Sequence, residues 1–171
     1  KKHAYGSTHL ITRLIDAVGQ VHKRYAETPD VVIGDLSRKG GGRLSPHKSH
    51  QNGLDADVGY YHLNPVAQDR FTLATAKNLD VGRTWTFVKR LLESGEVQYI
   101  FMSTSIQKLL RAYVLKRRRA DSAWCLRFLR VLAHRRYGKT RKRRGRGASG
   151  WGRCVLKTFS HRGDHNALIR H

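Results

Sequence analysis

Apolar residues recur every three or four positions across residues 8–25, which is the spacing of one face of a helix. The apolar positions of this stretch are Leu10, Ile11, Leu14, Ile15, Val18, Val21 and Tyr25. Pro29 ends the helical spacing, and the β-branched run 31–33 before Gly34 is typical of a short buried strand. The pattern therefore predicts a helix followed by a strand.

Residues 54–61 alternate between apolar and polar side chains, as a strand does when its two faces meet different surroundings. One face carries the apolar residues Leu54, Ala56, Val58 and Tyr60, and the other carries Asp55, Asp57 and Tyr61. The alternation predicts a strand with two carboxylates on the face turned away from the core.

The second half of the chain mixes the two periods. Residues 84–92, 106–114 and 120–133 have helical spacing, whereas residues 97–102 are typical of a strand. No repeated strand–helix–strand unit and no internal repeat appears. The sequence therefore predicts the α+β class, in a single domain over residues 1–171.

Charge narrows the choice of partner. The chain of 171 residues has a formal net charge of +22, which indicates an anionic partner. Residues 116–147 hold 14 Lys or Arg residues and a single acid, Asp121, so we expect a mobile basic loop at residues 134–150. No apolar run reaches the length of a membrane span, and any export signal is expected to lie outside this sequence.

Two cysteines leave the redox compartment open. A disulfide between Cys125 and Cys154 would close the basic loop, but a buried thiol and an incidental one explain them equally well. Two cysteines are too few for a zinc site made of cysteine alone.

Candidate metal ligands are densest in residues 47–57, which contain His47, His50, Asp55 and Asp57. Imidazole and carboxylate groups suit zinc, and a catalytic zinc site needs about three of them and an open position. An extended chain would place His50 and Asp57 about 23 Å apart, so they can share an ion only if the chain bends. The turn dipeptide 52–53 is placed to make that bend. The alternative is a solvated polar loop with acids that face water.

These residues resemble a known family. Gly34-Asp35-Leu36-Ser37, the three glycines at 40–42 and the run 47–57 are similar to the pattern GDxS…GGG…HxSHQxGLDxD of the penicillin-insensitive murein endopeptidases. Weaker likeness continues through residues 83–85, 99–101, 106–110 and 168–171. These enzymes share a fold with the lysostaphin-type and D-Ala-D-Ala peptidases.

The resemblance implies a peptidase fold with a small mixed-to-antiparallel sheet flanked by helices, and zinc as the cofactor. It makes His50 and Asp57 zinc ligands and His47 a further ligand or a neighbour of one, while Asp55 would support the loop by accepting backbone donors. The implied activity is hydrolysis of D-alanyl–diamino acid cross-links in peptidoglycan, in the periplasm or outside the cell. Arg43 and Lys48 flank the site and are candidates to hold substrate carboxylates.

The sequence also departs from the family. The family carries a His-x-His pair near its C-terminus that supplies a third ligand and a catalytic histidine, and no such pair occurs here. We therefore expect the sequence to stop short of the last strand of the fold, to be inactive or impaired in activity, and to have no assigned catalytic residue. His161, His165 and His171 are expected to be surface histidines.

Two other functions stay open at this point. The charge, with Trp124, Tyr137 and Trp151 among the basic residues, suits a nucleic-acid-binding domain, our second choice. A noncatalytic wall-binding module descended from the enzyme is the third. The sequence does not predict an oligomeric state.

Overall fold

The computed structural model describes residues 3–45, 47, 49–64 and 70–117, together with the backbone of residues 153–158 and 168–170. These parts contain both helices and strands, which confirms the predicted α+β class. In chain order the elements are β1 (Tyr5–Ser7), α1 (Thr8–Arg24), β2 (Asp55–Gly59), α2 (Val81–Glu93), β3 (Val97–Phe101), α3 (Thr104–Lys116), β4 (Arg153–Thr158) and β5 (Leu168–Arg170).

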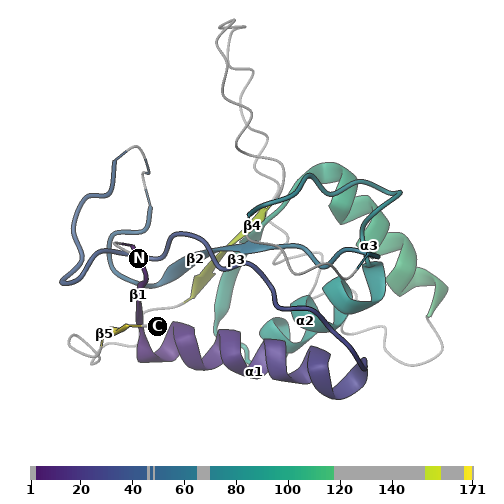
Figure 1. Ribbon diagram of the computed structural model, residues 1–171, viewed down its shortest axis with the longest axis horizontal. Coiled ribbons are helices and arrows are strands. Elements are labelled where there is room, and N and C mark those ends of the chain that lie inside the picture. Colours follow the sequence, from purple (N-terminus) through teal and green to yellow (C-terminus); the bar gives the residue numbers. More distant parts are fainter. Residues whose placement is uncertain are drawn as a thin grey trace, which may run out of the picture.

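The strands form two antiparallel groups. β1 pairs with β5, and a three-stranded sheet has the order β2-β4-β3, so its central strand comes last in the sequence (Figure 1). Asp57 of β2 and Phe101 of β3 both stand opposite position 155 of β4. The sheet thus joins three segments that are far apart along the chain.

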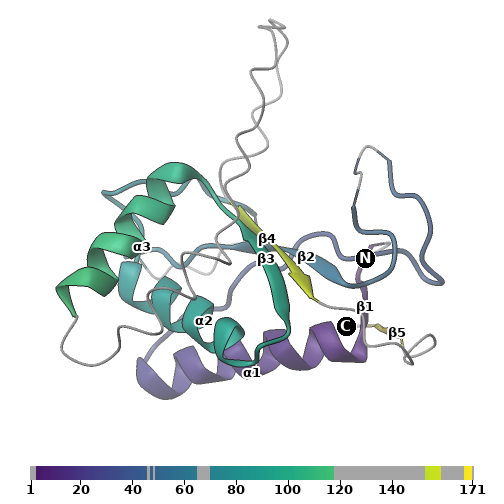
Figure 2. The ribbon, with the colours of Figure 1, turned by 180° about the vertical axis from the view of Figure 1, so that it is seen from behind.

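The core lies between this sheet and the helices. α1 runs along one side of the sheet and packs against α2, as both views of the ribbon show (Figures 1 and 2). Ala56, Val58 and Ile100 are fully buried and meet the apolar faces of the helices in one hydrophobic cluster. Burial of these faces fixes which side of β2 points toward the core.

Helix starts follow from capping side chains. Ser7 accepts a hydrogen bond from the backbone N–H of Leu10, which starts α1 at the predicted position. Asp80 does the same for α2 and Ser103 for α3. Because of these two caps, α2 begins at residue 81 and α3 at residue 104, a few residues before the predicted starts at 84 and 106.

One strand prediction needs correction, and one alternative is excluded. The run 31–33 is half-buried and forms an isolated bridge between Ile33 and Val58, with the hydrogen bond from Gly59 N–H to the carbonyl of Val32, rather than a regular buried strand. In β2, Asp55 and Asp57 do lie on the face away from the apolar cluster, but neither faces water, because both are buried. That face is covered by the loop that precedes it.

Several predictions fall outside the described residues: the helix at 120–133, the basic loop at 134–150 and the cysteine pair. Among the helices that are described, none combines the length and the apolar character needed to cross a membrane.

Candidate metal centre

The long loop between residues 34 and 53 projects beyond the sheet, at the left of Figure 1, and then returns to β2. Gly41 and Gly42 pack against the end of this loop, where the N–H of Gly42 donates to the carbonyl of Gln51 at 2.7 Å. Gly41 has φ +77°, and a Cβ there would lie 2.7 Å from the same carbonyl oxygen. Glycine is therefore required at position 41 for the loop to close beside His50.

The chain reverses just before β2, as the dipeptide at 52–53 predicted. Gly53 has φ +68°, and the side chain of Asn52 accepts from the N–H of Leu54. His50 itself has φ +62°, a conformation in which a non-glycine residue is strained. In this conformation the His50 side chain lies beside Asp55 and Asp57 of β2.

Asp57 is held against the segment on its other side. The N–H of Gly34 donates to the carbonyl of Asp57 at 2.8 Å, and the N–H of Asp57 donates to the carbonyl of Asp35 at 3.1 Å. A Cβ at Gly34 would lie 3.1 Å from that of Asp57 and 2.6 Å from the ring of Phe71. The absence of a side chain at position 34 thus lets both groups approach.

Three side chains converge at this point. One ligand atom from each of His47, His50 and Asp57 lies within 4.8 Å of the other two, the one such group of metal-ligating side chains among the described residues. Nε2 of His50 is 3.4 Å from Oδ1 of Asp57. The rings of His47 and His50 meet edge to face at 5.0 Å. His50 and Asp57 are 1% and 0% exposed, whereas His47 is half-buried.

Asp55 supports His50, as expected. Both of its carboxylate oxygens accept from the backbone N–H of His50 at 3.0 Å, and Oδ2 also lies 3.3 Å from Nδ1 of the ring. A ligand histidine commonly has a carboxylate at one ring nitrogen while the other faces the metal. In His50 these are Nδ1 beside Asp55 and Nε2 beside Asp57.

The electrostatics of His50 follow from this placement. Burial lowers the pKa of His50, but the hydrogen bond with Asp57 and the charges of Asp55 and Asp57 outweigh it, so the pKa is raised above 6.5. The two carboxylates therefore favour positive charge at this position.

The donor set fits a divalent metal ion. Two imidazoles and one carboxylate are the ligand types of catalytic zinc sites, which use three protein ligands and keep one position open. Two buried acids beside a buried imidazole also place more negative than positive charge where a cation would lie. His47, His50 and Asp57 are the residues that would hold such an ion.

A second carboxylate lies at the outer edge of the cluster. Asp35 is 3.3 Å from Nε2 of His47 through one oxygen and 3.3 Å from Nδ1 of His3 through the other. We call His50, Asp55 and Asp57 the inner half of the site, and His3, Asp35 and His47 the outer half. The side chains of the outer half are between 22% and 37% exposed.

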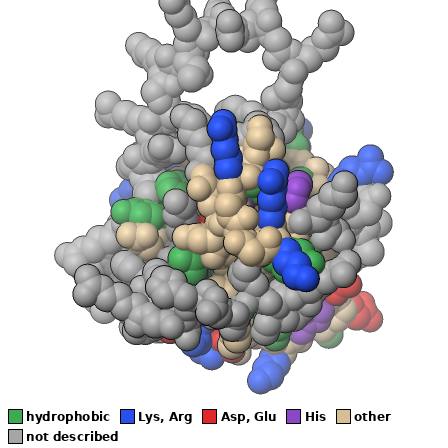
Figure 3. All heavy atoms as spheres, turned by 90° about the vertical axis from the view of Figure 1, so that its left-hand side faces the viewer, with side chains coloured by type: hydrophobic (Ala, Val, Ile, Leu, Met, Phe, Trp, Pro, Cys, Tyr) green, Lys and Arg blue, Asp and Glu red, His purple; other side chains and the backbone are tan. Residues whose placement is uncertain are grey.

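The rim of the site is basic. The loop carries three exposed cations, Arg38, Lys39 and Arg43, and the face of the molecule that it forms shows Lys and Arg side chains gathered with a histidine among them (Figure 3). Arg43 is exposed on this loop and Lys48 lies outside the described residues, so their role toward substrate carboxylates stays a prediction. Cations at this rim suit carboxylate groups of a substrate.

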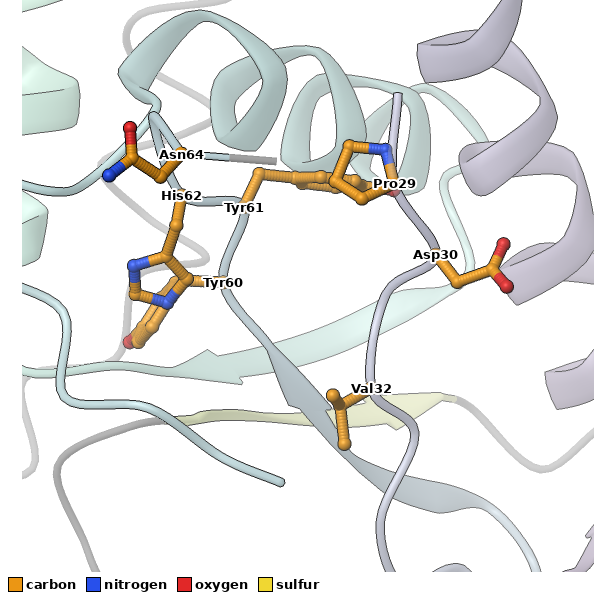
Figure 4. Close-up of a pocket in the computed structure, with 7 residues that line it drawn as sticks. All are labelled: Pro29, Asp30, Val32, Tyr60, Tyr61, His62 and Asn64. Carbon is orange, nitrogen blue, oxygen red and sulfur yellow. The ribbon is translucent and has the colours of Figure 1, made fainter. Parts of the chain in front are cut away.

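A small pocket lies at the other end of β2 (Figure 4). Its lining includes Tyr61 and His62 after β2 and Pro29 and Asp30 from the facing segment, with the Asp30 carboxylate turned away from the rest. His62 is buried, and burial lowers its pKa below 6.5 against an opposing effect of the Asn78 backbone. Among the described residues that line this pocket, the carboxylate of Asp30 points away from His62, so the pocket differs from the metal centre.

Sequence reasoning found the inner half and missed most of the outer half. The structure brings His47, His50 and Asp57 together, and His161, His165 and His171 lie outside the described residues. The sequence reasoning did not single out His3, and it included Asp35 only as part of the GDxS pattern. Nothing in the local spacing links His3 to His47, because their contact runs through Asp35.

Comparisons with known proteins agree with the motif. The sequence model of a family described as penicillin-insensitive murein endopeptidase matches residues 1–141. Over 55 residues the chain is 44% identical to the protein of that name from Haemophilus influenzae. That alignment covers 32% of this chain and 18% of the relative, so the chain matches less than a fifth of the relative's length.

Proposed function

Because the chain belongs to the penicillin-insensitive murein endopeptidase family, we propose that it is a zinc-dependent peptidase that hydrolyses peptide cross-links of peptidoglycan. The bond proposed is the one between D-alanine and a diamino acid. We further propose that it adopts the peptidase fold expected from the resemblance. It would work in the periplasm or outside the cell, where this substrate lies.

The observation that carries the proposal is the convergence of His47, His50 and Asp57 in the stretch that carries the family signature. Three ligands would hold zinc and leave one position open for water or substrate. The sequence has no His-x-His pair to supply a third ligand, so His47 would take that role.

Zinc, when bound, would polarise the peptide carbonyl and make water acidic enough to act as a nucleophile near neutral pH. The chain's own residues prepare the site for it. Asp55 fixes the backbone and ring of His50, and the burial of Asp57 keeps solvent away from its carboxylate. Arg38 and Arg43 at the rim would hold free carboxylates of the peptide stems.

Digestion of purified sacculi tests the proposal. We expect the zinc-loaded chain to release muropeptides slowly, because the sequence has no His-x-His pair, with cross-linked dimers becoming monomers as measured by chromatography and mass spectrometry. A chelator and Asp57→Asn should both abolish release, whereas Asp30→Asn, an exposed aspartate away from the site, should leave it unchanged. Stoichiometric zinc with no release by the wild type would contradict the peptidase proposal. Release that survives both chelator and Asp57→Asn would contradict the metal site.

The nucleic-acid alternative gains no support from the described residues. It rested on the net charge of the chain and on Trp124, Tyr137 and Trp151, and these three aromatic residues lie outside the described residues. Nucleic-acid binding therefore stays a prediction from charge alone.

A further inference from the structure

The carboxylate of Asp35 lies between two imidazole rings. Its Oδ1 is hydrogen-bonded to Nδ1 of His3 at 3.3 Å, and its Oδ2 lies 3.3 Å from Nε2 of His47. An ionised carboxylate only accepts hydrogen bonds, so the ring nitrogens facing it are the ones that carry hydrogen.

The backbone fixes Asp35 on both sides. Its carbonyl accepts from the N–H of Asp57, and the next residue, Leu36, donates to the carbonyl of His3. The first bond ties Asp35 to the strand that carries the ligand Asp57, and the second ties it to the segment that carries His3. Asp35 is therefore anchored to one candidate ligand through its backbone while its side chain reaches another.

The two ligand histidines are supported in the same way but through opposite ring nitrogens. Asp55 lies 3.3 Å from Nδ1 of His50, whose Nε2 faces Asp57. Asp35 lies 3.3 Å from Nε2 of His47, which leaves Nδ1 of His47 for an ion. Such carboxylates fix both the tautomer and the orientation of a ligand ring.

We propose that Asp35 is a positioning residue that holds His47 with hydrogen on Nε2, so that Nδ1 binds the metal ion of the active site. This rests on the proposed function, since it requires His47 to be a ligand. His3 has a supporting part: it occupies the second oxygen of Asp35 and so limits rotation of the carboxylate. Neither residue contacts the reacting atoms.

Metal affinity of the full chain tests the proposal without relying on activity. We expect Asp35→Asn to weaken zinc binding by about 10-fold in competition with a chromogenic chelator, because the amide can present a donor to His47. Asp35→Glu keeps the charge and should remain within about threefold of the wild type. Asp30→Asn is the matched control, and thermal unfolding without metal should be the same for all four proteins.

A spectroscopic measurement reports the ring nitrogen directly. In long-range ¹H–¹⁵N correlation spectra of the zinc-bound wild type, we expect His47 to be bound through Nδ1 and His50 through Nε2. The visible spectrum of the cobalt-substituted protein should change in Asp35→Asn and stay the same in Asp30→Asn.

Each other outcome overturns the inference. Unchanged affinity in Asp35→Asn, beside a large loss in Asp57→Asn, rejects the role of Asp35 and leaves the proposed function standing. Equal weakening in the Asn and Glu variants, with both less stable without metal, assigns Asp35 to folding instead. Binding of His47 through Nε2 rejects the tautomer. A wild-type chain that binds no zinc removes the metal site and this inference with it.

Discussion

The inner and outer halves of the candidate site use the same chemistry in different surroundings. In each half a carboxylate lies 3.3 Å from an imidazole, but His50 and Asp55 are almost completely buried while Asp35 and His47 are partly exposed. Water screens an exposed pair and competes for its hydrogen bonds, whereas a buried pair keeps its full strength. If the site binds an ion as proposed, the comparison teaches that the buried inner half would fix the ion's position, while the partly exposed outer half would orient His47 toward it.

Removal of the buried ligand should have the largest effect. Asp57→Asn keeps the shape of the side chain but replaces a charged ligand with a neutral amide, and we expect zinc affinity to fall by more than about 100-fold. Chelator competition measures the loss. Far-ultraviolet circular dichroism should match the wild type, and a zinc affinity within about tenfold of the wild type would show that Asp57 is not a ligand.

Loss of the inner supporting carboxylate should come next. In Asp55→Asn the amide cannot accept from the N–H of His50 through both oxygens, so zinc affinity should fall by about 10- to 100-fold. The fall should exceed that of Asp35→Asn measured in the same assay, because Asp55 is buried and Asp35 is not. Equal effects would erase the distinction between the two halves.

The glycine loop offers a smaller test of how the inner half is held. Gly41→Ala introduces a Cβ 2.7 Å from the carbonyl of Gln51 at positive φ, and should lower the free energy of unfolding by about 1–3 kcal/mol. Gly40→Ala is the matched control, since its φ is +79° but its Cβ would meet nothing within 4 Å. Urea denaturation should therefore show a larger loss for Gly41→Ala. Equal losses would mean that backbone strain alone matters here.

The smallest expected effect compares two buried histidines. The pKa of His50 is raised by its acids, whereas burial lowers that of His62. The unfolded chain binds a proton at His62 more readily than the folded chain does. The stabilising contribution of neutral His62 is therefore complete above pH 6.5, and stability falls as the pH drops from 6.5 toward the lowered pKa of His62 in the folded state. In metal-free protein, His62→Gln should lose less stability than the wild type between about pH 7.5 and about pH 5.5.

Urea denaturation at both pH values measures this difference. Since His50 is present in both proteins, its own titration cancels in the comparison. A wild type and a variant with the same pH dependence would show that His62 is as easily protonated in the folded state as in the unfolded one.

The sequence predicted those features that depend on local pattern. The apolar spacing located α1, α2 and α3, and the alternation of residues 54–61 located β2. The Asn52–Gly53 dipeptide predicted the turn that returns the loop to Asp57. These features follow from side-chain period and turn chemistry, which act over a few residues.

Features that depend on distant segments could not be predicted in this way. The burial of Asp55 and Asp57 requires the loop to fold over them, and the contacts of Asp35 join residues from three parts of the chain. The irregular pairing of residues 31–33 with β2 was also missed. A β-branched run indicates an extended chain, but it does not show whether the adjacent strand will pair with it along its whole length.

The place of β4 in the middle of the sheet has a consequence for synthesis on the ribosome. In the sheet, β4 (residues 153–158) lies between β2 and β3. Both of these strands are therefore synthesised long before the strand that pairs with them. At ordinary translation rates the interval between the end of β2 and the start of β4 is roughly 5 to 20 s. Throughout it the nascent chain exposes unpaired strand edges, which are templates for aggregation. Heterologous production should therefore benefit from slow expression at low temperature or from a chaperone that shields those edges.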